Sequence, residues 1–222
     1  KLPAGILPTD VAFRLLESFG IPVVPTQLAR SPEEAAAAAE HIGFPVALKI
    51  ESVQISHKSD VGAVALGLSS STEVRDAFRR LHERVIAKLP TAETAGVVVQ
   101  RMAPEGVEMM IGIKRDPLFG PVVICGFGGV LVELLKDVAI GIPPLSRQQA
   151  HDLLTRLRGQ PLLAGLRGKP PADVDSLCDT IVRVSQLAVS LGDQLLALDI
   201  NPLLVHANSY GVIAVDALVQ IA

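Results

Sequence analysis

Short apolar runs rich in Val, Ile and Leu recur along the whole chain, and the segments between them change in character near residues 104–106. Before this turn, the runs alternate with segments of helical periodicity, such as the one that begins at Ser31 and ends near Gly43. After the turn, several runs follow one another closely, as the strands of an antiparallel sheet do. This order predicts a mixed α/β fold of the α+β type in two lobes, residues 1–103 and 104–222, with the turn as a hinge.

The composition excludes several classes of protein. Of the 222 residues, 49% are hydrophobic, which is enough for a sizeable core, and the net charge of −3 does not favour nucleic acid or an anionic membrane as a partner. No apolar run reaches the roughly 18 residues that span a bilayer, and no signal-peptide pattern opens the chain. Cys125 and Cys178 share no metal-ligand spacing and suit a reducing compartment. We therefore expect a cytoplasmic protein that binds neither membrane nor nucleic acid.

The first candidate site lies where the apolar run 44–50 gives way to a polar loop. Lys49 is a cation that a strand core does not need, and His57 and Lys58 stand in the loop that follows. An ammonium group can hold phosphates, and an imidazole can accept a phosphoryl group near neutral pH. Taken singly, each residue is more typical of a solvent-exposed surface, but together they indicate a loop that handles phosphate.

A glycine-rich loop and a nearby acid form the second candidate. The loop Gly126-Phe-Gly128-Gly129 follows a predicted strand and can offer backbone N–H groups to phosphate. It lacks the lysine of a Walker A loop and the full spacing of a dinucleotide-binding loop, so the pattern alone is weak. Glu108 stands among apolar residues on the strand after the hinge, where it either faces solvent or needs a partner.

A carboxylate and an amide inside an apolar run form the third candidate. Asp199 and Asn201 alternate with apolar residues, so both side chains point to one face of a predicted strand that Pro202 ends. Oxygen ligands of this kind suit Mg²⁺ that is shared with phosphates. Asp216 is a similar but weaker case, because it also lies in an apolar run.

Taken in order, these motifs resemble the ATP-grasp subunit of ADP-forming acyl-CoA synthetases, which are relatives of the succinyl-CoA synthetase β chain. The resemblance covers nearly the whole chain and rests on Lys49, His57-Lys-Ser-Asp-Val-Gly62, Lys114-Arg-Asp-Pro-Leu-Phe-Gly-Pro121, Gly126-Phe-Gly-Gly129 and Asp199-Ile-Asn201-Pro202. It implies a two-lobed ATP-grasp fold with the nucleotide between the lobes. The implied cofactors are ATP or ADP and Mg²⁺.

The resemblance also implies a role for each matching residue. Lys49 would hold the nucleotide phosphates, and His57 would relay a phosphoryl group between the nucleotide and a phosphohistidine of the partner. The implied site comprises His57 as the catalytic residue, Lys49, Gln100, Arg101, Met102, Glu108, Gly126, Gly128 and Gly129 for ATP, and Asp199 and Asn201 for the metal.

The implied reaction converts an acid, CoA and ATP into acyl-CoA, ADP and phosphate, or runs in reverse. Nothing in the sequence resembles the parts that bind CoA or transfer the acyl group. We therefore expect a CoA-binding ligase domain or α subunit as the partner, in cis or in trans, within an oligomer. The acyl substrate would be bound by that partner, so this sequence does not identify it.

Four positions depart from the pattern of the relatives, namely Ala63, Arg101, Gly141 and Ala197. Gly141 stands where relatives often carry Arg, and Ala197 where they often carry an acid. Loss of these charges would weaken phosphoryl transfer and Mg²⁺ binding. Gly141 and Ala197 motivate an alternative: a catalytically degenerate ATP-grasp module that serves regulation or assembly in a fusion of the protein acetyltransferase type. A carboxylate–amine ligase on the same fold is a third hypothesis, but it would not need His57 in this loop.

Overall fold

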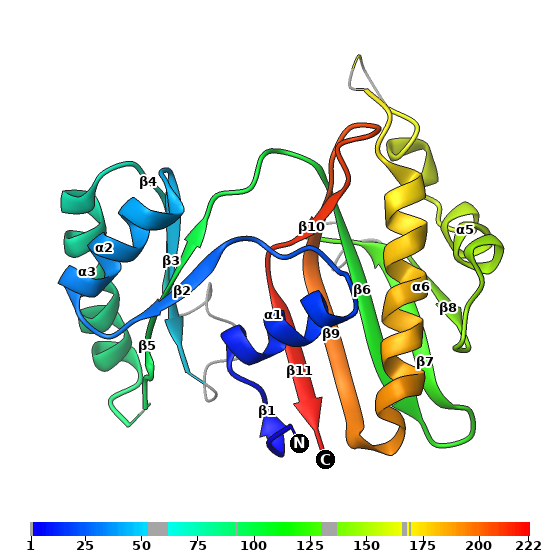
Figure 1. The fold of residues 1–222 in the computed structure, drawn as a ribbon, viewed down its shortest axis with the longest axis horizontal. Helices are drawn as coiled ribbons and strands as arrows, with labels where there is room; N and C mark the ends of the chain where they lie inside the picture. Colours follow the sequence, from blue (N-terminus) through cyan, green and yellow to red (C-terminus); the bar gives the residue numbers. More distant parts are fainter. Residues whose placement is uncertain (1, 53–61, 92, 130–136, 166–167, 169) are drawn as a thin grey trace. The chain divides into compact units, whose positions relative to one another are not determined.

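The computed structural model describes residues 2–52, 62–91, 93–129, 137–165, 168 and 170–222. The chain divides into two compact units (Figure 1), which we call unit 1 (Lys1–Leu7, Ala12–Val23 and Ala103–Ala222) and unit 2 (Pro8–Val11 and Val24–Met102). In the part of the chain that the structure describes, no helix has the length and apolar character needed to cross a membrane.

The division differs at the N-terminus from the expected lobes 1–103 and 104–222, because residues 1–7 and 12–23 belong to unit 1. Strand β1 (Gly5–Ile6) pairs antiparallel with β11 (Ala217–Ile221), which fixes the start of the chain to unit 1. Helix α1 (Thr9–Ser18) contributes its first residues to unit 2 and the rest to unit 1. Such pairing between chain ends leaves no local signal in the sequence.

Unit 2 contains a four-stranded antiparallel sheet in the order β2-β5-β3-β4. Its elements are β2 (Thr26–Ala29), α2 (Pro32–Ile42), β3 (Val46–Glu51), β4 (Val64–Leu68), α3 (Ser71–Lys88) and β5 (Gly96–Arg101). Ser31 and Ser70 cap the two helices, because each hydroxyl accepts a hydrogen bond from a backbone N–H in the first turn. The expected start of α2 at Ser31 is confirmed.

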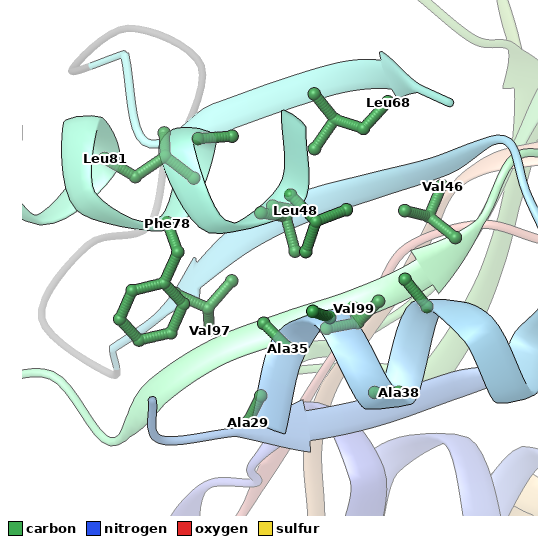
Figure 2. Packing of buried hydrophobic residues seen from close by; sticks show 14 of the residues in the cluster. Ala29, Ala35, Ala38, Val46, Leu48, Leu68, Phe78, Leu81, Val97 and Val99 are labelled. Carbon is green, nitrogen blue, oxygen red and sulfur yellow. The ribbon is translucent and has the colours of Figure 1, made fainter. Parts of the chain in front are cut away.

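The core of unit 2 lies between its sheet and its two helices (Figure 2). Val46, Leu48 and Ile50, at alternate positions of β3, are fully buried in this core. The alanines of α2, such as Ala35 and Ala38, are small and buried in this core, which lets the helix pack against the sheet (Figure 2). Since strand side chains alternate, the intervening residues of β3 point to the opposite face.

Unit 1 contains a seven-stranded sheet in the order β1-β11-β9-β6-β7-β8, and β10 pairs with β9 beside this path. The further elements are β6 (Val107–Asp116), β7 (Gly120–Phe127), β8 (Val138–Gly141), α5 (Arg147–Thr155), η1 (Gln160–Leu162), α6 (Val174–Leu191), η2 (Gly192–Gln194), β9 (Leu195–Val205) and β10 (Val212–Ala214). Helices α5 and α6 lie on one face of the sheet (Figure 1). Ser146 and Gln149 form a capping box at α5, and Asp173 caps α6.

Two predicted strands differ from the observed ones. A strand was expected over residues 21–24, but this segment forms only an isolated bridge at Val23, and β2 begins at Thr26. Pro22 and Pro25 cannot donate the backbone hydrogen bonds of a sheet, which explains why the strand begins only at Thr26. The expectation that Pro202 ends its strand is wrong: β9 continues to Val205, and a register shift in the pairing with β6 accommodates the proline.

Candidate functional site

The face of the unit 1 sheet that α5 and α6 leave uncovered carries most of the predicted site residues of this unit; we call it the open face. On β6, Met109, Ile111 and Ile113 are buried toward the helices. Glu108 and Gly112 occupy the alternate positions and so belong to the open face. Asp199 of β9 pairs with Gly112 and therefore also lies on the open face. The sheet thus brings Glu108 and the predicted metal ligands to one surface.

Asp199, Asn201 and Asp216 meet on the open face, which we call the acidic cluster. Strands β9 and β11 pair antiparallel, with Asp199 opposite Leu218. The same register continues to Asn201, whose backbone N–H donates to the Asp216 carbonyl oxygen at 3.1 Å. Asp216 is therefore the cross-strand neighbour of Asn201, and it joins the two residues that the sequence pattern singled out.

One oxygen of the acidic cluster has no hydrogen-bond partner among the residues that the structure describes: Asp199 Oδ1 is buried and accepts no hydrogen bond from them. Burial, and secondarily the charge of Asp216, raise the pKa of Asp199 above its ordinary value. A buried carboxylate oxygen without a donor is costly, and a bound cation would remove this cost. The donor set of two carboxylates and one amide fits Mg²⁺, which prefers oxygen ligands.

The acidic cluster contains too few acids to enclose a metal ion. Within the described ranges, no group of three or more His, Cys, Asp or Glu side chains is arranged to hold a metal. A cation here would complete its coordination with other oxygens, such as water or the phosphates of a nucleotide. Asp216 was not among the predicted ligands, and its signal in the sequence was a carboxylate inside the apolar run 214–218.

The glycine loop packs directly against Glu108. Gly128 donates its N–H to the Glu108 carbonyl oxygen at 2.7 Å, so this group is not available to phosphate, and the expectation of a free donor is wrong there. Gly129 has a φ of +62°, and a side chain at this position would overlap Glu108 Oε2. At Gly126, a Cβ would lie 2.6 Å from the Asp137 carbonyl oxygen. These glycines therefore permit close packing, which places the Glu108 carboxylate beside the loop.

Lys49 and Gln100 share one face of the unit 2 sheet. Lys49 is half-buried, lies opposite Val98, and points away from the core side that Leu48 defines. The sequence pattern places Lys49 near the end of the run 44–50, but β3 continues to Glu51. Gln100 is fully buried on the same face, and its Nε2 donates to Thr26 Oγ1 at 3.2 Å. The sheet therefore brings these two predicted residues together.

Arg101 does not join Lys49 and Gln100. It follows Gln100 on β5, so its side chain leaves the other face of the sheet, where Nη1 donates to the Ile42 carbonyl oxygen at 3.2 Å. This contact places a cation at the C-terminus of α2, which the helix dipole favours. Met102 follows, half-buried, and its N–H donates to the Pro45 carbonyl oxygen at 3.0 Å.

His57, the predicted catalytic residue, lies outside the described residues, and its role stays a prediction. The strands on both sides of residues 53–61 are described. The Ile50 N–H donates to the Ala63 carbonyl oxygen at 2.9 Å, and Ser52 Oγ donates to the Glu93 carbonyl oxygen at 2.7 Å. The backbone on either side of the segment is therefore held by hydrogen bonds.

Of the two substitutions that raised the alternative of a degenerate module, only one lies on the open face. A Cβ at Gly141 would lie 3.0 Å from Leu145 and 3.1 Å from Leu153, so this position faces α5. Ala197 pairs with Lys114, two residues before Asp199, and so belongs to the open face. The acid missing at Ala197 is thus a local change beside an acidic cluster that still has two carboxylates.

Comparison with known proteins places the chain in context. The sequence profile of the ATP-grasp domain matches residues 3–221. The β subunit of acetate–CoA ligase [ADP-forming] I from Pyrococcus furiosus is 41% identical over 206 residues, which are 93% of this chain and 88% of that subunit. Acetate–CoA ligase [ADP-forming] I from Archaeoglobus fulgidus is 42% identical over 199 residues, 90% of this chain but only 29% of that protein.

Solved structures agree with the sequence comparison. The dinucleotide forming acetyl-coenzyme A synthetase 1 of Ca. Korarchaeum cryptofilum, in complex with coenzyme A, Ca-AMPCP and HgCl+, superposes with a TM-score of 0.94 at 41% identity, covering 98% of this chain and 94% of that one. A second structure of that synthetase holds coenzyme A and Mg-AMPPCP, with its phosphohistidine segment pointing towards the nucleotide-binding site. Its TM-score is 0.85 at 38% identity, with 98% of this chain and 93% of that one covered.

Proposed function

Since this chain belongs to the ATP-grasp domain family, we propose that it is the nucleotide-binding and phosphoryl-transferring part of an ADP-forming acyl-CoA synthetase. The full reaction would convert an acid, CoA and ATP into acyl-CoA, ADP and phosphate, and it would also run in reverse. The chain spans 88% of a β subunit but 29% of a single-chain relative. The CoA chemistry therefore belongs to a separate domain or α subunit, within an oligomer.

The unpartnered Asp199 Oδ1 is the observation that carries this proposal. A folded chain tolerates such a buried carboxylate oxygen at a cost of about 1–3 kcal/mol, and that cost is expected where a ligand later supplies the missing contact. Asp199, Asn201 and Asp216 would hold Mg²⁺ together with nucleotide phosphates. When bound, the cation would neutralise charge on the phosphates during transfer.

Lys49 and Glu108 would act on the two ends of the nucleotide. The Lys49 ammonium group would hold the phosphates as a fixed cation. Glu108 would accept hydrogen bonds from the ribose or adenine side, beside the glycine loop that keeps its carboxylate in place. Gln100, held by Thr26, would orient the base, and Arg101 would contribute indirectly by fixing the end of α2.

His57 would carry the phosphoryl group. The bond between the γ-phosphorus and the ADP oxygen would break, and a bond from the phosphorus to an imidazole nitrogen would form. The phosphohistidine segment of the Korarchaeum synthetase, which points towards its nucleotide site, supports phosphoryl transfer through histidine. A phosphohistidine of the partner would then exchange the group with His57. Magnesium and ATP or ADP are the cofactors this scheme needs.

The alternative of a catalytically degenerate module is not supported. The relatives reported above are ligases or synthetases, and Gly141, one of its two motives, faces α5 rather than the open face. A carboxylate–amine ligase has no support from these relatives either. The acyl substrate would be chosen by the partner.

Two measurements test the proposal. Calorimetric titration of the full-length protein with Mg-ATP and Mg-ADP should show binding that Lys49→Ala weakens by about tenfold or more, since one charge-assisted contact to phosphate contributes about 1.5–3 kcal/mol. ATP labelled in its terminal phosphate should transfer label to the protein in an acid-labile, alkali-stable form. If His57→Ala left phosphoryl transfer through the complete enzyme unchanged, the relay would be refuted.

A further inference from the structure

Glu51 is a buried carboxylate with no role in the scheme above. It is the last residue of β3 and only 8% exposed. Its Oε1 accepts the Thr9 N–H at 2.9 Å, and its Oε2 accepts the Thr9 hydroxyl at 2.8 Å, although 42 residues separate the two in sequence. Both residues belong to unit 2. Both oxygens of the Glu51 carboxylate thus accept hydrogen bonds from Thr9.

The position of Thr9 suits it to donate hydrogen bonds to a carboxylate. Thr9 is the first residue of α1, where backbone N–H groups lack helical partners and the helix dipole attracts negative charge. Two donors directed at a carboxylate make charge-assisted hydrogen bonds, which are about twice as strong as neutral ones. The contact therefore fixes the end of β3 to the start of α1 more firmly than ordinary packing would.

Glu51 also lies beside Lys49. The two residues are two positions apart on β3, so their side chains leave the same face, with Cα atoms about 7 Å apart. The backbone at this end of the strand has further anchors, since the Glu51 carbonyl oxygen accepts the Ala95 N–H at 2.8 Å. Whatever holds Glu51 therefore also holds the backbone from which the Lys49 side chain extends.

We propose that Glu51 is a positioning residue for Lys49: by binding both donors of Thr9, it fixes the strand end that directs the lysine toward nucleotide phosphates. This inference rests on the proposed function, in which Lys49 holds those phosphates. A lysine has four rotatable bonds and loses rotamer entropy when it is fixed, so a rigid backbone beneath it improves binding. Glu51 itself touches no phosphate in this scheme.

Thr9→Val is the sharpest test, because valine keeps the size of threonine but cannot donate to Glu51 Oε2. We expect this change to weaken binding of Mg-ADP to the full-length protein by about 3- to 10-fold, as loss of part of a charge-assisted hydrogen bond would. Thr9→Ser keeps the hydroxyl and should restore the affinity. Thr155→Val is the matched control, since it removes a hydroxyl hydrogen bond of 2.8 Å from α5 in unit 1 and should leave Mg-ADP affinity unchanged.

Titration of Thr9→Val with Mg-ADP in a Lys49→Ala background shows whether Glu51 acts through Lys49. If Glu51 acts through Lys49, Thr9→Val should have no further effect once the lysine is absent. A loss of affinity that persists in that background would overturn the positioning role and leave the proposed function intact. If Lys49→Ala alone did not weaken Mg-ADP binding, the proposed function would fail, and the positioning role with it.

A second variant covers the case in which Thr9→Val does not fold. Glu51→Gln keeps the size of the side chain and weakens its bonds to Thr9 by removing the charge. Removing a negative charge near Lys49 would by itself strengthen phosphate binding, so weaker binding in this variant points to lost positioning. Unchanged or tighter Mg-ADP binding in Glu51→Gln would overturn the inference.

Discussion

Asp199→Asn should make the ligand-free protein more stable and the nucleotide complex less stable. The folded wild type carries a buried carboxylate whose Oδ1 has no partner and whose pKa is raised by burial and by Asp216. A pKa raised above 3.8 means that the folded protein binds this proton more tightly than the unfolded chain does. The contribution of Asp199 to stability is therefore lost as pH rises from 3.8, the unfolded pKa, through the raised pKa of the folded protein. At neutral pH this contribution is unfavourable.

The size of the gain follows from the geometry. A buried group without its hydrogen bond costs about 1–3 kcal/mol, and among the described residues only Oδ1 of the two Asp199 oxygens is buried without such a bond. Asparagine removes the charge but keeps the shape, so we expect the free energy of unfolding to rise by about 1 kcal/mol. For a chain of this length, that corresponds to an increase in Tm of about 2–4 °C.

In the presence of Mg-ATP, the wild type should become more stable than Asp199→Asn. At Mg-ATP concentrations about 100 times Kd, binding stabilises a protein by about 2.7 kcal/mol. The wild type should gain this amount, while Asp199→Asn, which has lost a metal ligand, should gain much less. Thermal unfolding at pH 7.5 with and without Mg-ATP would measure both effects. Asp76→Asn is the control, because Asp76 is an exposed residue of α3 that pairs with Arg79 at 3.4 Å and should change neither value.

Two outcomes would refute this reasoning. If Asp199→Asn lowered the Tm of the ligand-free protein, Asp199 would have a stabilising contact and would not be an uncompensated charge. If the variant gained as much stability from Mg-ATP as the wild type, Asp199 would not be a metal ligand. Repeating the ligand-free comparison at pH 4 provides a third check, because the advantage of asparagine should shrink as the wild-type carboxylate takes up its proton.

Four further predictions concern the glycines and the thiols. Gly129→Ala should displace Glu108 and weaken Mg-ATP binding in titrations, whereas Gly120→Ala, with a similar φ of +72° and no atom within 4 Å of the new Cβ, should cost only backbone strain. Gly141→Arg should lower the Tm by at least several degrees, because the side chain meets Leu145 and Leu153, and should not improve nucleotide binding. Burial raises the pKa of Cys125 to about 12 and that of Cys178 to about 11, so a thiol reagent should modify them only on unfolding. Because both values exceed 9.0, stability should fall as pH rises above about 9, which thermal unfolding at pH 8 and pH 10 would show.

The sequence predicted those parts of the candidate site that depend on local periodicity. Alternation along one strand was enough to put Asp199 and Asn201 on one face, and the observed β9 confirms the strand. The position of Asp216 beside them depends on the pairing of β9 with β11, which is set by turn geometry and packing across the sheet. The sequence pattern could therefore note Asp216 but not bring it to the cluster.

Arg101 and Gly128 show a different limit. Both lie in motifs that resemble a nucleotide site, yet Arg101 donates to the end of α2, and the Gly128 N–H donates to Glu108. Motif matching assigns a role to every residue of a motif, whereas the structure shows which hydrogen-bonding groups are already used within the fold. The positions of Glu51 and Thr9 were missed because their contact joins segments 42 residues apart.

The order of strands in unit 1 has a consequence for synthesis of the chain. Strand β9 lies between β6 and β11 in the sheet, and β1 pairs only with β11, the last strand. As the chain leaves the ribosome, most of unit 2 is complete by residue 102, but the unit 1 sheet is complete only once β11 has been made. One edge of β6 stays unpaired until β9 is made, and β1 stays unpaired until β11 is made, so products truncated before these strands should expose edges that favour aggregation. The acidic cluster accordingly forms only after the segment from Asp216 through β11 has been made.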